Sequence, residues 1–227
     1  MAIRNFFLSV KGCSIVFKLV TTFGQPYEIR QMTVQDIGPL LELESDVWGS
    51  RACTDGNIHA RINMFSEGQL VASLEDGQII GYNGLQLVDS LWESNSSWAE
   101  ITGDGTISTH AHHGQYLFGV SLTVHEHYSG IGAELLNAGQ KLLSRHKKKG
   151  LFIGSRVPNF SKNSKEFSIK QWVYGQNLQS RDPVVAFFQH HGFKILHIIA
   201  NYFEDPESCN YGVLMYNGTF KCHQLKD

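Results

Sequence analysis

Two glycines, Gly130 and Gly132, follow an apolar run that ends at Val124, and a helical pattern begins directly after them. A strand, a glycine turn and a helix bring successive backbone N–H groups and the positive end of a helix dipole to one point. Glycine permits the close approach of an anion and the positive φ that some such turns require. The segment Tyr128-Ser129-Gly130-Ile131-Gly132-Ala133 therefore predicts a phosphate-binding turn, although a tight turn without a ligand has the same pattern.

Two other phosphate motifs do not fit this turn. The dinucleotide-binding fingerprint needs a third glycine and an acid that closes the next strand, whereas the glycine pair here is followed by Leu135 and lacks both features. A P-loop needs Gly-Lys-Ser or Gly-Lys-Thr after its first glycine, and the first lysine after the turn is Lys141.

Histidines and a glutamate flank the apolar run, and these residue types can transfer protons near neutral pH. The residues are His110, His112 and His113 before the run and His125, Glu126 and His127 after it. The His-Ala-His-His spacing has no neighbouring carboxylate or cysteine, so no metal site is predicted. An ordinary polar loop would also explain the histidines.

Composition limits the partners and the compartment. The chain has 227 residues, of which 42% are hydrophobic, and this length suits one large domain. A formal net charge of −2 gives no general attraction for nucleic acid or an anionic membrane, and we predict neither as a partner. Lys11 and Lys18 interrupt the first apolar run before it reaches membrane-spanning length. The four cysteines are scattered, which favours a reducing cytoplasm.

The first half predicts strands and helices around a hairpin. Residues 27–32 alternate like a strand, and Thr33 with Asp36 resembles a capping box that opens a helix, which Pro39 should bend or delay. A second short helix should cover residues 58–65. Residues 70–75 and 78–87 flank Asp76-Gly77, a pair suited to a type I′ hairpin turn. Residues 88–114 are polar and long enough to be a functional loop.

The second half predicts a strand, helix, strand unit with a parallel, right-handed crossover. Its parts are a central strand over 116–124, a helix from Gly132 to Lys149 and a strand over 151–155. Residues 159–181 are polar, and their length favours a functional insertion or a small excursion over a plain connection. Asp182 and Pro183 should open a helix that runs to His191, and two strands over 193–202 and 211–216 should close the fold.

This order of elements resembles the GNAT superfamily of N-acetyltransferases. The turn at 128–133 is similar to its cofactor motif, and residues 182–193 are similar to its following helix. Residues 98–110, 154–158 and 202–216 resemble acetyltransferase domains that are fused to carbon-nitrogen hydrolases. The resemblance implies an α/β (α+β) fold: a mixed, mostly antiparallel central sheet flanked by helices, with a splayed central strand pair. Residues 27–227 would form the GNAT domain, and residues 1–26 an N-terminal extension or extra strand.

The resemblance also implies where acetyl-CoA would lie. The pantetheine arm would pair with the backbone of Leu122, Thr123 and Val124. The diphosphate would lie on N–H groups of His127, Tyr128, Ser129, Gly130, Ile131, Gly132 and Ala133. The thioester would sit where the central strands splay. His110 and Glu126 are the candidate bases, and Arg156 and Tyr202 are candidates for the acceptor pocket.

Two residues depart from the family pattern. His127 stands where the usual Arg or Gln precedes the first glycine by three residues. An alignment anchored on Tyr128 instead puts Ser129 at that position, with the loop shortened by two residues. Phe188 stands where many relatives have a tyrosine that protonates the leaving thiolate, and a phenyl ring cannot donate a proton.

We therefore expect an N-acetyltransferase that moves an acetyl group from acetyl-CoA to a primary amine, on a small molecule or a peptide. Phe188 and the altered turn keep open the alternative of a non-catalytic acyl-CoA-binding module. A structural domain without a ligand is a third alternative, which does not explain the glycine pair. The sequence leaves open whether the chain forms a homodimer.

Overall fold

The computed structural model describes residues 17–91 and 94–218, and these residues form an eight-stranded sheet in the order β1-β2-β3-β4-β5-β6-β8-β7. The strands are β1 Phe17–Val20, β2 Pro26–Gln31, β3 Gln69–Leu74, β4 Ile79–Val88, β5 Tyr116–Val124, β6 Gly150–Arg156, β7 Lys194–Ile199 and β8 Gly212–Gly218. Neighbouring strands are antiparallel except β5 and β6, which are parallel. The predicted mixed, mostly antiparallel sheet is confirmed.

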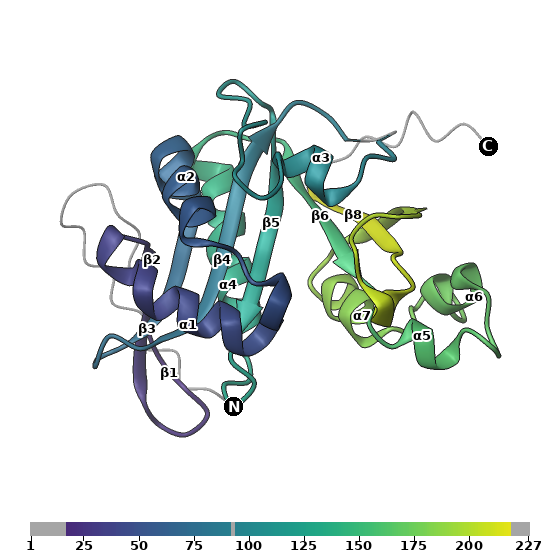
Figure 1. Ribbon diagram of the computed structural model, residues 1–227, viewed down its shortest axis with the longest axis horizontal. Coiled ribbons are helices and arrows are strands. Elements are labelled where there is room, and N and C mark those ends of the chain that lie inside the picture. Colours follow the sequence, from purple (N-terminus) through teal and green to yellow (C-terminus); the bar gives the residue numbers. More distant parts are fainter. Residues whose placement is uncertain (1–16, 92–93, 219–227) are drawn as a thin grey trace.

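Helices cover both faces of this sheet (Figure 1). They are α1 Ile37–Trp48, α2 Asp55–Phe65, α3 Trp98–Thr102, α4 Ile131–Arg145, α5 Phe160–Asn163, α6 Ile169–Tyr174 and α7 Pro183–His190. Alternation along β3 shows how the two faces are filled. Leu70 and Ala72 join the core with Leu135 of α4, whereas Val71 packs with Ile37 and Ile58 of α1 and α2.

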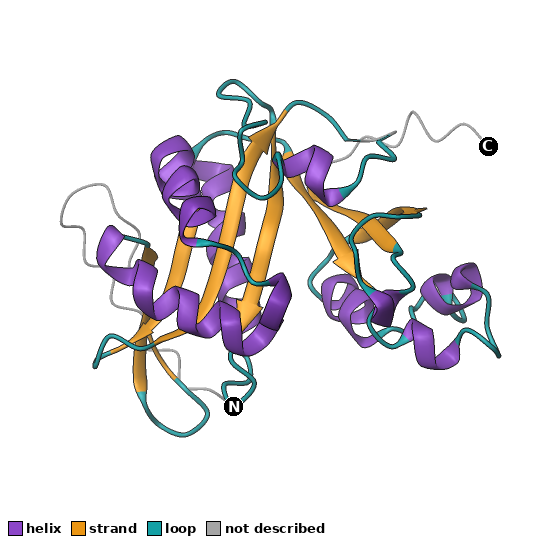
Figure 2. Ribbon diagram, in the orientation of Figure 1, coloured by secondary structure: helices purple, strands orange, loops and turns teal. Residues whose placement is uncertain are grey.

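The central strands β5 and β6 pair over a short length and then diverge (Figure 2). Their register runs from Leu117 opposite Leu151 to Gly119 opposite Ile153 and ends there. Beyond that point β6 still pairs with β8, and β5 still pairs with β4. The β6-facing edge of β5 therefore has no partner strand after Gly119, which confirms the splayed pair.

Capping residues begin the helices where the sequence predicted. Thr33 and Asp36 form the capping box, but a 3-10 turn over Val34–Asp36 precedes α1, so Pro39 lies in the first turn of the α-helix. Asp182 caps α7 by accepting the N–H groups of Val184 and Val185, with Pro183 in the first turn.

Two boundaries differ from the predictions. A type I′ turn needs positive φ at both central residues, but among Glu75, Asp76 and Gly77 only Gly77 has it, at +91°. The Leu74 N–H donates to Gln78 O, so the hairpin has a three-residue loop. Helix α4 ends at Arg145 rather than Lys149.

The early end of α4 has a local cause. Lys147 adopts a φ of +52°, and the Lys149 N–H donates to Gln115 O beside the start of β5. The chain has therefore left the helix before β6 begins at Gly150.

The N-terminal segment contributes an edge strand, since β1 pairs antiparallel with β2. Residues 1–16 of the predicted extension lie outside the described residues. Within 17–91 and 94–218, no helix combines the length and apolar character needed to cross a membrane.

Candidate functional site

A cleft of about 1380 Å³ opens where β5 and β6 diverge. Its walls come from α1 and the turn after it, from β5 and β6, from the start of α4 and from α7. The glycine turn lies at the end of β5, and Gly130 and Gly132 both line the cleft. The structure thus places the predicted cradle and the predicted splay in one continuous space.

The conformation of Gly130 explains why a glycine stands there. Its φ is +88°, and it is the N-cap of α4. A Cβ at this position would meet no atom within 4 Å, so backbone conformation rather than crowding requires the glycine. At Gly132 a Cβ would lie 3.5 Å from Val124 and 3.6 Å from Phe187, which leaves little room for a larger side chain.

Some backbone N–H groups at the glycine turn donate hydrogen bonds within the turn, and others do not. The His127 N–H donates to the His125 ring, and the Tyr128 N–H donates to His125 O. The N–H groups of residues 129–133 make no hydrogen bond to another described residue, and the first bond of α4 runs from Glu134 N to Gly130 O. Five successive free donors at the positive end of a helix dipole can bind an anion, whereas the N–H groups of His127 and Tyr128 are engaged within the turn.

Strand β5 carries a bulge at the splay. Gly84 pairs with Ser121 and Leu85 pairs with Gly119, so Val120 is the extra residue. The Val120 carbonyl accepts a hydrogen bond from Trp98 Nε1 at 2.9 Å. From Val120 to Val124 the β6-facing edge of β5 is free of strand pairing, and an extended ligand can bind to such an edge.

A buried polar group joins α1 to β5. Thr123 Oγ1 donates to Glu44 Oε1 at 2.5 Å and accepts from Trp48 Nε1 at 2.8 Å, and the Ser121 hydroxyl lies 3.2 Å away. Glu44, Trp48 and Ser121 line the cleft, whereas Thr123 is fully buried behind them. Of the predicted pantetheine contacts, Leu122 and Val124 line the cleft.

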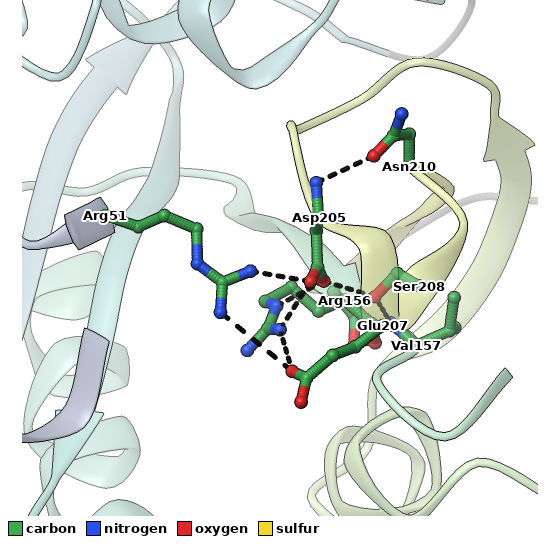
Figure 3. A network of polar contacts seen from close by, with 8 residues as sticks. Arg51, Arg156, Val157, Asp205, Glu207, Ser208 and Asn210 are labelled. Atoms are coloured by element: carbon green, nitrogen blue, oxygen red, sulfur yellow. Dashed lines mark hydrogen bonds and ion pairs between the residues drawn. The ribbon is translucent and has the colours of Figure 1, made fainter. Parts of the chain in front are cut away.

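Ion pairs span the mouth of the cleft between the turn after α1 and the loop before β8 (Figure 3). Arg51 Nη1 lies 2.7 Å from Asp205 Oδ1, and Arg156 Nε lies 2.6 Å from Asp205 Oδ2. Arg156 also contacts Glu207, and its guanidinium lies over the Trp48 ring at 5.1 Å. Arg156, predicted for the acceptor pocket, thus lines the cleft while it is bound in an ion-pair network.

The charge of Asp205 is stabilised by these contacts. Burial acts to raise the pKa of its carboxyl, but hydrogen bonds from Arg156 and Ser208 outweigh burial and lower that pKa to about 2. The carboxylate is therefore ionised at neutral pH and holds both arginines in place.

Tyr202 lies at the splay with a buried hydroxyl that has no hydrogen-bond partner among the described residues. A Cβ at Gly154 would collide with this hydroxyl, so the ring packs on the first residue of β6 beyond the paired segment. Burial raises the pKa of Tyr202, which keeps it protonated and able to donate. Tyr202 and Phe188 both line the cleft.

His110 lies outside the cleft, and its position does not support the predicted role as base. Its Nδ1 accepts the Leu87 N–H at 3.1 Å, and its ring stacks on Phe65 with centroids 4.8 Å apart. Burial, with the nearby His112 and Lys148, lowers the pKa of His110 to about 4. His110 therefore satisfies a buried backbone donor and packs against Phe65.

Glu126 lines the cleft but lies beyond the end of β5, and its side chain is exposed. Glu126 follows the bulge residue Val120 by six positions, which correspond to roughly 20 Å in an extended chain. Glu126 is therefore beside the anion cradle rather than beside the bulge.

Sequence reasoning missed Glu44 and Arg61, which are both almost fully buried and line the cleft. The sequence contains a signal that could have identified both residues. Glu44 lies four residues after Leu40 and four before Trp48, so a charge falls on the apolar stripe of α1. Arg61 occupies the equivalent position on α2, three residues after Ile58, where it donates to Gly105 O.

Two relatives from Bacillus subtilis (strain 168) resemble the chain in sequence. An uncharacterised N-acetyltransferase, YkwB, is 33% identical over 204 residues, which cover 85% of this chain and 90% of YkwB. A probable hydrolase, YhcX, is 31% identical over 202 residues, and the match covers 86% of this chain but only 39% of YhcX. No family model matches the chain.

Solved structures share the fold. The loading GNATL domain of CurA from Lyngbya majuscula has a TM-score of 0.75 at 22% identity, over 85% of this chain and 97% of that domain. A GphF GNAT-like decarboxylase in complex with isobutyryl-CoA has a TM-score of 0.73 at 24% identity, over 84% and 98%. Arabidopsis thaliana Naa50 with a CoA bisubstrate analogue has a TM-score of 0.54 at 16% identity, over 85% and 99%. Together with the match to almost all of YkwB, these likenesses show that the chain belongs to the GNAT superfamily of N-acetyltransferases.

Proposed function

We propose that this chain transfers an acetyl group from acetyl-CoA to a primary amine. The observation that carries the proposal is the continuity of three features in one cleft: an anion cradle, a free strand edge and a bulge at the splay. The CoA diphosphate would accept hydrogen bonds from the backbone N–H groups of residues 129–133. The pantetheine arm would pair along the edge from Val124 to Val120, and the thioester would reach the bulge.

The names of the relatives support a CoA ligand. GphF is described with isobutyryl-CoA, and Naa50 is described with a CoA-containing bisubstrate analogue. YkwB, which matches this chain along most of its length, is named as an N-acetyltransferase. The amine would enter between the turn after α1 and the loop before β8, where Arg51, Arg156 and Glu207 line the cleft. A small-molecule amine or the end of a peptide suits this opening.

Tyr202 is the group that we assign to the leaving sulfur. Phe188 occupies the position of the expected tyrosine and has no donor, whereas the Tyr202 hydroxyl is buried, protonated and without a partner among the described residues. A hydrogen bond from this hydroxyl would stabilise negative charge as the C–S bond breaks.

A steady-state assay tests the proposal. Release of CoA from acetyl-CoA is followed with a thiol reagent in the presence of polyamines, L-amino acids and short peptides, and the acetylated product is identified by mass spectrometry. Acceptor-dependent CoA release is the expected result. Tight acetyl-CoA binding with no release for any acceptor would instead favour the non-catalytic acyl-CoA-binding module, the alternative that Phe188 raises. The same assay with isobutyryl-CoA tests the acyl chain length.

A further inference from the structure

Glu44 is a carboxylate on the apolar face of α1. Only 2% of the residue is exposed, yet it lines the cleft. No nitrogen of a described Lys, Arg or His side chain lies within 4.0 Å of its oxygens, and its hydrogen-bond partners include Thr123 Oγ1 and, at 3.4 Å, the Cys53 N–H. The Cys53 side chain and the buried Arg61 guanidinium of α2 also interact with this carboxylate electrostatically. Burial of a carboxylate without a direct ion pair is energetically costly, and groups kept at such a cost gather at functional sites.

The hydrogen bonds at Thr123 have one possible direction. Trp48 Nε1 is only a donor and the Glu44 carboxylate is only an acceptor, so the single hydroxyl hydrogen of Thr123 points to Glu44. Thr123 Oγ1 must then accept from Ser121, whose hydroxyl lies 3.2 Å away. The hydrogens therefore run from Ser121 to Thr123 to Glu44, and the lone pairs of Ser121 are left for another donor.

Ser121 is the first residue of this series of hydrogen bonds, and it lies beside the reaction centre of the proposed function. It follows the bulge residue Val120, it lines the cleft, and its side chain shares a face of β5 with that of Thr123. Thr123 is 0% exposed, so the middle of the chain is shielded from water. The hydroxyls thus connect the bulge to a carboxylate deep in the wall of the cleft.

We infer that Ser121, Thr123 and Glu44 form the proton-accepting chain of the acyl-transfer reaction, an inference that rests on the proposed function. The amine nitrogen attacks the thioester carbon and forms the C–N bond. Its proton passes to Ser121 Oγ as the Ser121 proton passes to Thr123 and the Thr123 proton passes to Glu44. The C–S bond then breaks with its electron pair on sulfur, and the CoA thiolate, hydrogen-bonded to Tyr202, takes a proton from water. Glu44 returns its proton to water when the product leaves.

Isosteric variants separate this role from a structural one. Glu44→Gln keeps the shape and the hydrogen bond from Thr123 but cannot take a proton, and Thr123→Val keeps the shape but breaks the chain. Thr123→Ser restores a hydroxyl. Glu42→Gln is the matched control, because Glu42 is exposed on the same helix and does not line the cleft.

The readouts are kcat and the pH profile of kcat/KM, measured with the best acceptor among polyamines, L-amino acids and short peptides. Calorimetric titration of acetyl-CoA and thermal unfolding are measured on every variant. We expect Glu44→Gln and Thr123→Val to lower kcat by about 10² to 10⁴, the usual range for general-base catalysis, with unchanged affinity for acetyl-CoA. Thr123→Ser should recover most of the rate that Thr123→Val loses.

The pH profile decides the assignment. The profile of kcat/KM against pH should be the same in the wild type and in Glu42→Gln, and it should change in Glu44→Gln. The ionisation of the acceptor contributes equally to all variants, so the difference between profiles reports Glu44. Near-normal kcat in a folded Glu44→Gln protein, or an unaltered pH profile, overturns the relay and leaves acyl transfer intact. Absence of acetyl-CoA binding or of turnover in the wild type overturns the proposed function, and the relay with it.

Discussion

Arg51 Nη1 donates to Asp205 Oδ1 at 2.7 Å across the mouth of the cleft, and this bond joins the turn after α1 to the loop before β8. Arg156 holds the same carboxylate from β6, so Asp205 stays paired when Arg51 is removed. We expect Arg51→Ala to reduce the free energy of unfolding by about 1 kcal/mol or less. It should raise KM for the amine acceptor and leave the Kd of acetyl-CoA unchanged, since the cradle is at the other end of the cleft.

Steady-state kinetics with calorimetry measure this difference, with Arg181→Ala as a control outside the cleft lining. Equal effects of both variants on KM would show that the ion pair has no role in acceptor binding.

Asp205 should make the stability of the protein depend on pH in the acidic range. Its pKa in the fold is about 2, below its ordinary value of 3.8, so the unfolded chain binds a proton more readily. The stabilisation is fully present above pH 3.8 and is lost as the pH falls toward 2. Asp205→Asn should therefore cost most stability at neutral pH and progressively less between about pH 4 and pH 2. Urea unfolding at several pH values tests this, and a difference that is independent of pH would contradict it.

Tyr202→Phe should separate stability from activity. The variant removes a buried hydroxyl that has no partner in the described residues, so the melting temperature should hold or rise. Turnover should fall, by up to about 10² to 10⁴ if the hydroxyl acts in leaving-group stabilisation, with an unchanged Kd for acetyl-CoA. Phe188→Tyr in this background places a phenol at the position that many relatives use, and we expect partial recovery of turnover. Full activity of Tyr202→Phe would show that the Tyr202 hydroxyl takes no part in the reaction.

His110→Ala should lower stability rather than rate. The substitution leaves the Leu87 N–H without its acceptor, and an unsatisfied buried donor costs about 1 to 3 kcal/mol. Because the pKa of His110 is about 4 in the fold, the wild type should also lose stability as the pH falls from 6.5 toward 4, and this dependence should weaken in the variant. His112→Ala, at an exposed neighbour, is the control. Turnover that drops by about a hundredfold or more at unchanged stability would restore His110 as a base.

Local rules predicted the elements more reliably than the side-chain contacts of the site. The capping residues Thr33 and Asp182 and the glycine at 130 act through neighbours in the chain, so their effects could be inferred from sequence. The partners of Glu44 and Tyr202 come from distant segments: Glu44 meets Thr123 across 79 residues, and Tyr202 packs on Gly154. His110 shows the same limit, because a family position predicted a base, whereas the contact with Leu87, which the sequence did not reveal, favours a packing role.

Isothermal titration of acetyl-CoA into the wild type and into Gly130→Val tests the central claim most directly. Gly130 has a φ of +88°, and a Cβ there would meet no atom within 4 Å, so valine strains the turn without a clash in the core. Circular dichroism and thermal unfolding establish that the variant is folded. We predict saturable one-to-one binding by the wild type and no measurable binding by folded Gly130→Val, because the cradle donors are displaced and blocked. Equal affinity of the two proteins, or no binding by the wild type, would contradict the assignment of this cleft to acetyl-CoA.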